Sequence, residues 1–121
     1  MGKIFKEVII FGSKSHKKLL ALFDTGATYN YIGYTFRDNS SIYDLGIIEY
    51  KEPLLVIFAN NTESEGQMIK LKSLHITKDK VINEPTFCLF DLKLCDIIIG
   101  AKLMQELKIA LNPSIKEVQF V

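Results

Sequence analysis

Arginine is the scarcest charged residue in this sequence. The chain has 121 residues with 15 Lys and Arg, of which Arg37 is the one arginine, against 14 Asp and Glu, and its formal net charge is +1. Charges of one sign form no continuous block. Arginine is the side chain best suited to forked recognition of phosphates and base edges, and a highly charged partner requires an oppositely charged surface. We therefore expect no nucleic-acid partner.

Long apolar runs are also absent. The longest purely apolar stretch is residues 54–59, far below the roughly 20 residues with which a helix crosses a bilayer. The first six residues lack the apolar stretch of a signal peptide, and Lys6 stands where a myristoylation signal carries Ser or Thr. These features predict a cytoplasmic protein with no membrane partner.

Residues that bind metals or form disulfides are few. The two cysteines, Cys88 and Cys95, fit neither a close metal-ligand pair nor a disulfide framework, so we expect free thiols that fill space in the core. The two histidines, His16 and His75, are not in a metal-binding spacing. The sequence thus predicts no metal site and no cofactor.

The composition favours one domain over residues 1–121, because 48% hydrophobic residues suffice for a continuous core. Short β-rich runs separated by turn residues predict strands at 3–11, 17–23, 29–32, 54–59, 67–76, 86–92, 96–99 and 116–121. Good helix formers at 101–108, with Leu103, Met104 and Leu107 on one face, predict a helix in the C-terminal region. We expect an irregular stretch with one short helical turn at 33–46. The pattern is typical of an all-β domain built as a closed barrel.

The most informative motif is Asp24-Thr25-Gly26-Ala27, which follows the apolar strand 19–23. A carboxylate delivered by such a strand is unfavourable unless hydrogen bonds or a charge compensate it. Gly26 permits a tight turn, and the small Ala27 leaves room beside the carboxylate for a ligand. A solvated turn aspartate is the alternative explanation of the motif taken alone.

A second segment favours a functional carboxylate over a solvated turn aspartate. Some seventy residues later, an apolar strand that begins at Asp96 runs through Ile98-Ile99-Gly100 into the predicted helix. The two segments together resemble the retroviral-type (retropepsin-like) aspartic proteases, in which an Asp-Thr/Ser-Gly-Ala loop is supported by a hydrophobic-hydrophobic-Gly segment. The resemblance extends over nearly the whole chain and includes a flap-like hairpin at about 57–68.

The resemblance implies a role for each matched residue. Asp24 would be the catalytic carboxylate, Thr25 would brace its counterpart across a symmetry axis, and Gly26 would present backbone groups to the substrate. The implied structural support of the site is Ile98, Ile99 and Gly100, and the implied substrate contacts are Ala27, Thr28, Phe58, Ala59 and Asn60. The last three belong to a flap that closes over a bound polypeptide.

Two positions depart from the pattern of the viral enzymes. Those proteins commonly carry Asp two residues after the motif glycine and Arg directly after the late glycine, and the two side chains pair. Here the positions hold Thr28 and Ala101. Because both partners are missing together, no buried charge is left alone, and the sequence resembles retrotransposon-type and cellular retropepsin-like domains more closely.

A single Asp-Thr-Gly motif implies two chains. Hydrolysis of a peptide bond without a metal or a nucleophilic side chain requires one carboxylate to deprotonate water and a second, protonated carboxyl group to serve as the acid. The other aspartates, Asp38, Asp44, Asp79, Asp91 and Asp96, lack the motif. We therefore expect an aspartic endopeptidase that is a homodimer, with the two Asp24 side chains at its two-fold axis.

Two further expectations concern the assembly. The resemblance implies a dimer interface formed by the terminal strands, at residues 4–9 and 118–121, although ordinary edge strands would explain these segments equally well. The alternative function is a catalytically weak or inactive retropepsin-like module for dimerisation or peptide binding. The retained Asp24 argues against this alternative, because a scaffold could avoid the cost of burying a carboxylate by using Asn or Ser.

Overall fold

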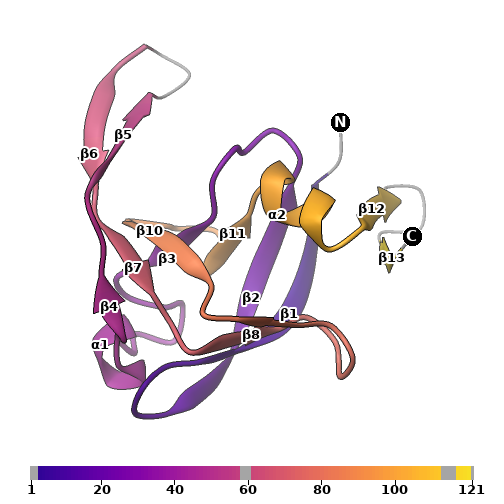
Figure 1. The fold of residues 1–121 in the computed structure, drawn as a ribbon, viewed down its shortest axis with the longest axis horizontal. Coiled ribbons are helices and arrows are strands. Elements are labelled where there is room, and N and C mark those ends of the chain that lie inside the picture. Colours follow the sequence, from indigo (N-terminus) through magenta and orange to yellow (C-terminus); the bar gives the residue numbers. More distant parts are fainter. Residues whose placement is uncertain (1–2, 58–60, 113–116, 121) are drawn as a thin grey trace.

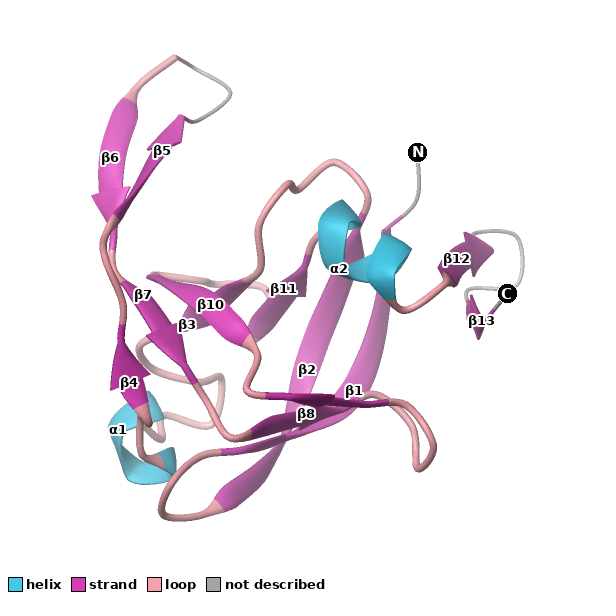
Figure 2. Cartoon of the chain, in the orientation of Figure 1, coloured by secondary structure: helices cyan, strands magenta, loops and turns pink. Residues whose placement is uncertain are grey.

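The structure is a computed structural model, and it describes residues 3–57, 61–112 and 117–120. Strands dominate it (Figures 1 and 2). The elements are β1 (Lys3–Phe11), β2 (His16–Asp24), β3 (Tyr31–Gly33), α1 (Ile42–Leu45), β4 (Glu49–Tyr50), β5 (Leu54–Ile57), β6 (Glu63–Gly66), β7 (Met68–Lys70), β8 (Ser73–His75), β9 (Val81–Asn83), β10 (Thr86–Phe90), β11 (Ile97–Ile99), α2 (Ala101–Glu106), β12 (Ile109–Asn112) and β13 (Glu117–Phe120).

Nine strands form one sheet in the order β4-β7-β10-β3-β11-β2-β1-β8-β9. The predicted all-β class agrees with this architecture, but the predicted closed barrel is wrong. Closure would require the two end strands to pair, whereas β4 pairs only with β7 and β9 only with β8 among the described residues. Both end strands are short, so they offer few ladder positions for a further partner.

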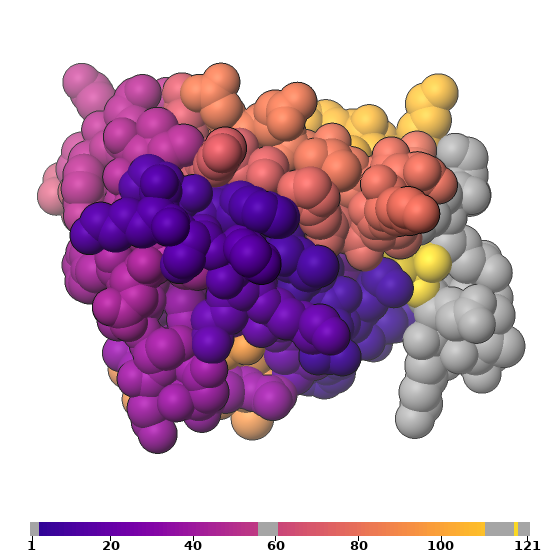
Figure 3. Space-filling view, turned by 90° about the horizontal axis from the view of Figure 1, so that it is seen from below, coloured from indigo at the N-terminus to yellow at the C-terminus, as the bar shows by residue number. Residues whose placement is uncertain are grey.

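The hairpin of β1 and β2 is the longest paired unit. Its antiparallel register runs without interruption from Lys3 opposite Asp24 to Phe11 opposite His16. Buried residues alternate with more accessible ones along β2, and Phe23 is fully buried beside the half-buried Leu22. In the view from below, this hairpin lies beside the β8–β9 segment (Figure 3).

Parallel pairing brings the late strand β11 next to the strand that carries Asp24. Ile97, Ile98 and Ile99 pair with residues 21, 22 and 23 of β2, and the other edge of β11 pairs with β3. The core is continuous around these strands, and it includes Phe23, Phe87 and Ile99. The two segments that resemble protease motifs are therefore adjacent in the centre of the sheet.

The described residues form two helices, α1 and α2. Helix α1 falls within the stretch for which we expected one helical turn, and its capping box explains why it forms: the Ser41 side chain accepts from the Tyr43 N–H while Asp44 returns a bond to the Ser41 N–H. Helix α2 buries Leu103 and Met104, as predicted, and ends at Glu106 instead of residue 108. No helix in the described parts of the chain is long and apolar enough to cross a membrane.

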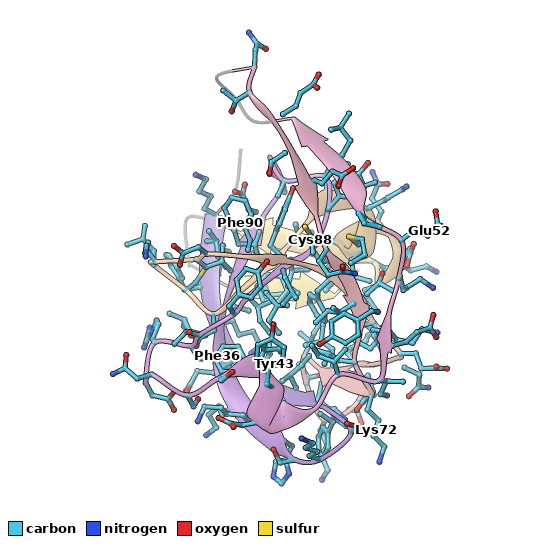
Figure 4. All side chains as sticks on the ribbon, turned by 90° about the vertical axis from the view of Figure 1, so that its left-hand side faces the viewer. Phe36, Tyr43, Glu52, Lys72, Cys88 and Phe90 are labelled. Atoms are coloured by element: carbon cyan, nitrogen blue, oxygen red, sulfur yellow. The ribbon has the colours of Figure 1, made fainter. Side chains whose placement is uncertain are left out.

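The β5–β6 hairpin rises away from the nine-stranded sheet (Figure 1). Its strands pair with each other from Leu54 opposite Gly66 to Ile57 opposite Glu63, and they form a separate two-stranded sheet. Seen from the side, it stands above Cys88 and Phe90 of β10 (Figure 4). The predicted strand at 67–76 is divided into β7 and β8, and the structure adds β4, β6, β9 and β12.

Candidate active site

Asp24 is the last residue of β2, and a tight turn follows it. The Gly26 N–H donates to Asp24 Oδ1 at 2.9 Å, and the Ala27 N–H donates to the Asp24 carbonyl at 3.1 Å. The Asp24 side chain is half-buried, and no other described residue donates a hydrogen bond to its carboxylate. The turn therefore fixes one carboxylate oxygen and leaves the other, Oδ2, available for a second group.

The loop that follows Asp24 is held by the junction between β11 and α2. The Ala101 N–H donates to the Ala27 carbonyl at 2.8 Å, and the Gly100 N–H donates to Asn30 Oδ1 at 3.0 Å. A Cβ atom on Gly100 would lie 2.6 Å from the Tyr29 carbonyl oxygen and 2.8 Å from that of Ala27. Only glycine permits this approach, so a residue seventy positions away fixes the backbone beside Asp24.

The two isoleucines before Gly100 have different surroundings. Ile99 pairs with Phe23 and is fully buried in the core. Ile98 pairs with Leu22 and is half-buried, and alternate residues of a strand share a face, so it lies on the same face of the sheet as Leu22 and Asp24. Ile99 thus packs beneath the site, whereas Ile98 lies beside it.

The remaining residues of the predicted site fall into two groups. Thr25, Gly26, Ala27 and Thr28 form one continuous loop after Asp24, in which Ala27 is half-buried and the other three are exposed. The predicted flap contacts Phe58, Ala59 and Asn60 lie outside the described residues.

Asn30 is a residue of the site that the sequence analysis missed. Its Oδ1 accepts from the Gly100 N–H, and its Nδ2 donates to the Thr86 carbonyl at 3.4 Å. The side chain therefore joins the Asp24 loop to both α2 and β10. The sequence signal was a polar residue within the predicted strand 29–32, three positions after the Thr-Gly-Ala turn.

Asp96 is the second such residue. It is 5% exposed, and its carboxylate accepts from the Leu20 N–H at 2.9 Å and from the Arg37 N–H at 2.7 Å. These two bonds compensate the burial of the charge and tie the start of β11 to β2 and to the segment after β3. Asp96 has a structural role and is not available as a second catalytic carboxylate.

The surroundings of two cysteines and of Asp38 shift the pKa values of these side chains. Burial raises the pKa of the Cys88 and Cys95 thiols, and both are free and buried. A raised pKa keeps a thiol protonated and hence unreactive. On the surface, hydrogen bonds from Lys17 and then Ser40 lower the pKa of Asp38. The described residues contain no cluster of three or more His, Cys, Asp or Glu side chains that could hold a metal.

A cavity of about 440 Å³ adjoins the Asp24 loop. Thr28, Tyr29 and Asn30 line one side of it, and Leu54 and Met68 at the base of the β5–β6 hairpin line another. The loop and the hairpin therefore border the same hollow, although they are far apart in sequence.

The fold is similar to that of a solved structure. A crystal structure described as a retropepsin-like aspartic protease from Rickettsia conorii aligns over 92% of this chain and 88% of that chain, with 17% sequence identity and a TM-score of 0.48. No family model matches the sequence. No curated protein matches it either.

Proposed function

We propose that this protein is an aspartic endopeptidase that acts as a homodimer on extended polypeptides. One observation carries the proposal: the Asp24 carboxylate stands at the end of a central strand, with Oδ1 bound to the Gly26 N–H and Oδ2 without a donor among the described residues. Gly100 and Asn30 hold the loop around it. Such an arrangement holds the carboxylate in a fixed orientation, as proton transfer to or from a bound substrate requires.

The proposed reaction uses two Asp24 side chains that share one proton. Like charges at close range raise one ionisation above the other, so one carboxylate serves as base while the other carboxyl group serves as acid. The base takes a proton from a water molecule while the water oxygen forms a bond to the carbonyl carbon of the peptide. At the same time the acid gives its proton to the carbonyl oxygen. The C–N bond then breaks as the leaving nitrogen takes the proton that the base received from water, and a hydroxyl group of the intermediate returns its proton to the other carboxylate as the carbonyl group re-forms. Activity falls at high pH, where both groups lose their protons.

A second copy of the chain supplies the second carboxylate in this proposal. Three of the other aspartates are already occupied: Asp96 is bound by two backbone N–H groups, Asp38 pairs with Lys17, and Asp44 caps α1. A two-fold axis beside Asp24 would bring the two identical side chains together.

The β5–β6 hairpin is the proposed flap. An extended polypeptide between the hairpin and the Asp24 loop would bind by backbone hydrogen bonds, as an added strand does, and its alternate side chains would enter pockets. We assign the contacts on the floor of this cleft to Gly26, Ala27 and Thr28. The contacts from the flap would be made by Phe58, Ala59 and Asn60.

The dimer interface is proposed at the free edge of β1. One edge of β1 pairs along its whole length with β2, and the other pairs with β8 only at Ile9–Phe11, so residues 3–8 have no ladder partner on that side among the described strands. Strand β13 already pairs with β12 in the same chain. The unpaired, buried thiols of Cys88 and Cys95 support a reducing, cytoplasmic location.

The test is cleavage of a mixed peptide library at mildly acidic pH by the unmodified protein and by Asp24→Asn. Asparagine keeps the shape of the side chain but cannot accept the proton, so we expect a loss of about 10²–10⁴-fold, which is typical of removing a general base. Equal cleavage by the two proteins would refute the proposal. Tight peptide binding without products would instead support a peptide-binding module.

A further inference from the structure

The cavity beside the Asp24 loop has the size of a binding site. Its volume of about 440 Å³ lies within the range of about 300–1,000 Å³ that is usual for ligand pockets. Four separate segments build its walls: the end of the Asp24 loop, the base of the β5–β6 hairpin, the turn between β9 and β10, and the first turns of α2. Asp24 itself does not line it, so the cavity has no part in the proposed bond cleavage.

The floor of the cavity is apolar. Leu103 and Pro85 are buried, and Leu54, Met68 and Ile82 are half-buried around them. These side chains expose apolar surface to the cavity, and filling it with an aliphatic group would remove that surface from water.

The rim of the cavity carries charges of both signs, from Glu84, Lys102 and Glu106. Glu84 lies 3.5 Å from Lys70, measured between Oε1 and Nζ, although Lys70 does not itself line the cavity. Lys102 and Glu106 are one turn apart on α2 and have opposite signs. Each glutamate at the rim thus has a lysine near it, and we expect the apolar floor to determine what the cavity prefers.

The cavity continues the proposed cleft. The carbonyl groups of Ala27 and Tyr29 contact Gly100 and Ala101, and the next residues of α2 line the cavity. A polypeptide held under the hairpin rises about 3.3 Å per residue, and its alternate side chains point to one face. A chain that crosses Asp24 and passes the base of the hairpin therefore presents a side chain to this cavity several residues from the bond that is cut.

We propose that this cavity is a specificity pocket that takes a long aliphatic side chain, Leu or Met, of the substrate polypeptide. The side chain belongs to a residue outside the two that flank the scissile bond. This inference rests on the proposed endopeptidase function.

The test compares Ile82→Trp, which fills the cavity, with Val81→Trp. Residues 81 and 82 are neighbours in β9 and point to opposite faces, and Val81 does not line the cavity, so the second variant is a matched control. Cleavage sites in a proteome-derived peptide library are read by mass spectrometry. We expect the unmodified protein and Val81→Trp to prefer Leu or Met at one such position, and Ile82→Trp to lose that preference at least tenfold. The same preference in both variants, or a preference for a charged side chain, would overturn the assignment.

A second variant guards against misfolding of Ile82→Trp. Met68→Ala enlarges the cavity, and we expect it to shift the preference from Leu towards Phe at the same position. A profile that Met68→Ala leaves unchanged would count against the pocket.

Failure of the endopeptidase proposal gives a different result. In that case neither the unmodified protein nor Asp24→Asn cleaves any peptide, and the pocket is tested by NMR titration with the probe N-acetyl-Ala-Leu-Ala-amide. We then expect chemical-shift changes at Thr28, Ile82 and Leu103 that Ile82→Trp abolishes and Val81→Trp retains. Absence of shifts at these three residues would reject the pocket itself.

Discussion

The Asp24 loop and the β5–β6 hairpin border the same cavity but are held in different ways. The loop is fixed by hydrogen bonds from Ala101 and Gly100, which belong to a distant segment, and it sits above the buried Phe23. Among the described residues, β5 and β6 form strand ladders only with each other. Leu55 is 54% exposed, and a second hollow of about 130 Å³ lies at the base of the hairpin.

This difference has a physical consequence for a polypeptide-cleaving site. A reacting carboxylate must be held in one geometry, because a misplacement of about 1 Å costs on the order of 10²-fold in rate. A covering element must open to admit a chain, and elements with few buried contacts open at low free energy. In the proposed endopeptidase, the Asp24 loop is the part held in place and the β5–β6 hairpin is the part that opens.

Gly100→Ala should have the largest effect on activity, because it disturbs the contacts that hold the Asp24 loop. The new methyl group would meet the Tyr29 and Ala27 carbonyl oxygens at less than 3.0 Å and push the Asp24 loop away from α2. We expect activity to fall on the order of 10²-fold, with a loss of about 1–3 kcal/mol in the free energy of unfolding. Ser64→Ala on the exposed hairpin is the control, and steady-state kinetics and urea titration measure both. Unchanged activity in Gly100→Ala would show that the loop position is not critical.

Asp96→Asn tests the second set of contacts that holds the strands beside Asp24, the hydrogen bonds to the Asp96 carboxylate. Asparagine offers one acceptor where the carboxylate offers two, so either the Leu20 or the Arg37 N–H is left facing an amide group. We expect a loss of about 1–3 kcal/mol in the free energy of unfolding, measured in urea. Asp79→Asn, at an exposed turn position, should be neutral. Equal stability of both variants would contradict the anchoring role of Asp96.

In the unmodified protein we expect a difference in amide exchange rate between the hairpin and the segment that holds the Asp24 loop, and this effect is the smallest of the three. We expect the amides of β5 and β6 to exchange roughly ten times faster than those of Gly100 and Ala101, because the hairpin has little buried support. Exchange followed by NMR measures each amide. Equal protection would mean that the hairpin is fixed as firmly as the loop.

The two strands beside the candidate site could be predicted from the sequence. The apolar strand before Asp24 and the apolar strand before Gly100 each have a strong local pattern, and the structure places them in adjacent parallel strands. The helix after Gly100 was also expected, because Leu103 and Met104 share its buried face.

The position of the second strand of the hairpin, the open edges of the sheet and the anchoring side chains could not be predicted from local pattern. Pairing between strand ends depends on contacts across the whole chain, and β4 and β9 are too short to give a sequence signal. Asp96 and Asn30 act through bonds to backbone groups that are far away in sequence, so their residue types alone carry little information. The role of a polar side chain that forms hydrogen bonds with distant backbone groups can be recognised only when the fold is known.

The central claim is that each chain supplies half of the catalytic pair, and subunit mixing tests it most directly. The unmodified chain at constant concentration is refolded from urea with increasing amounts of Asp24→Asn, and peptide cleavage is measured. Because mixed dimers would hold one carboxylate instead of two, we predict that an excess of the variant drives activity towards zero. Activity that stays constant at every excess would show that one chain is sufficient.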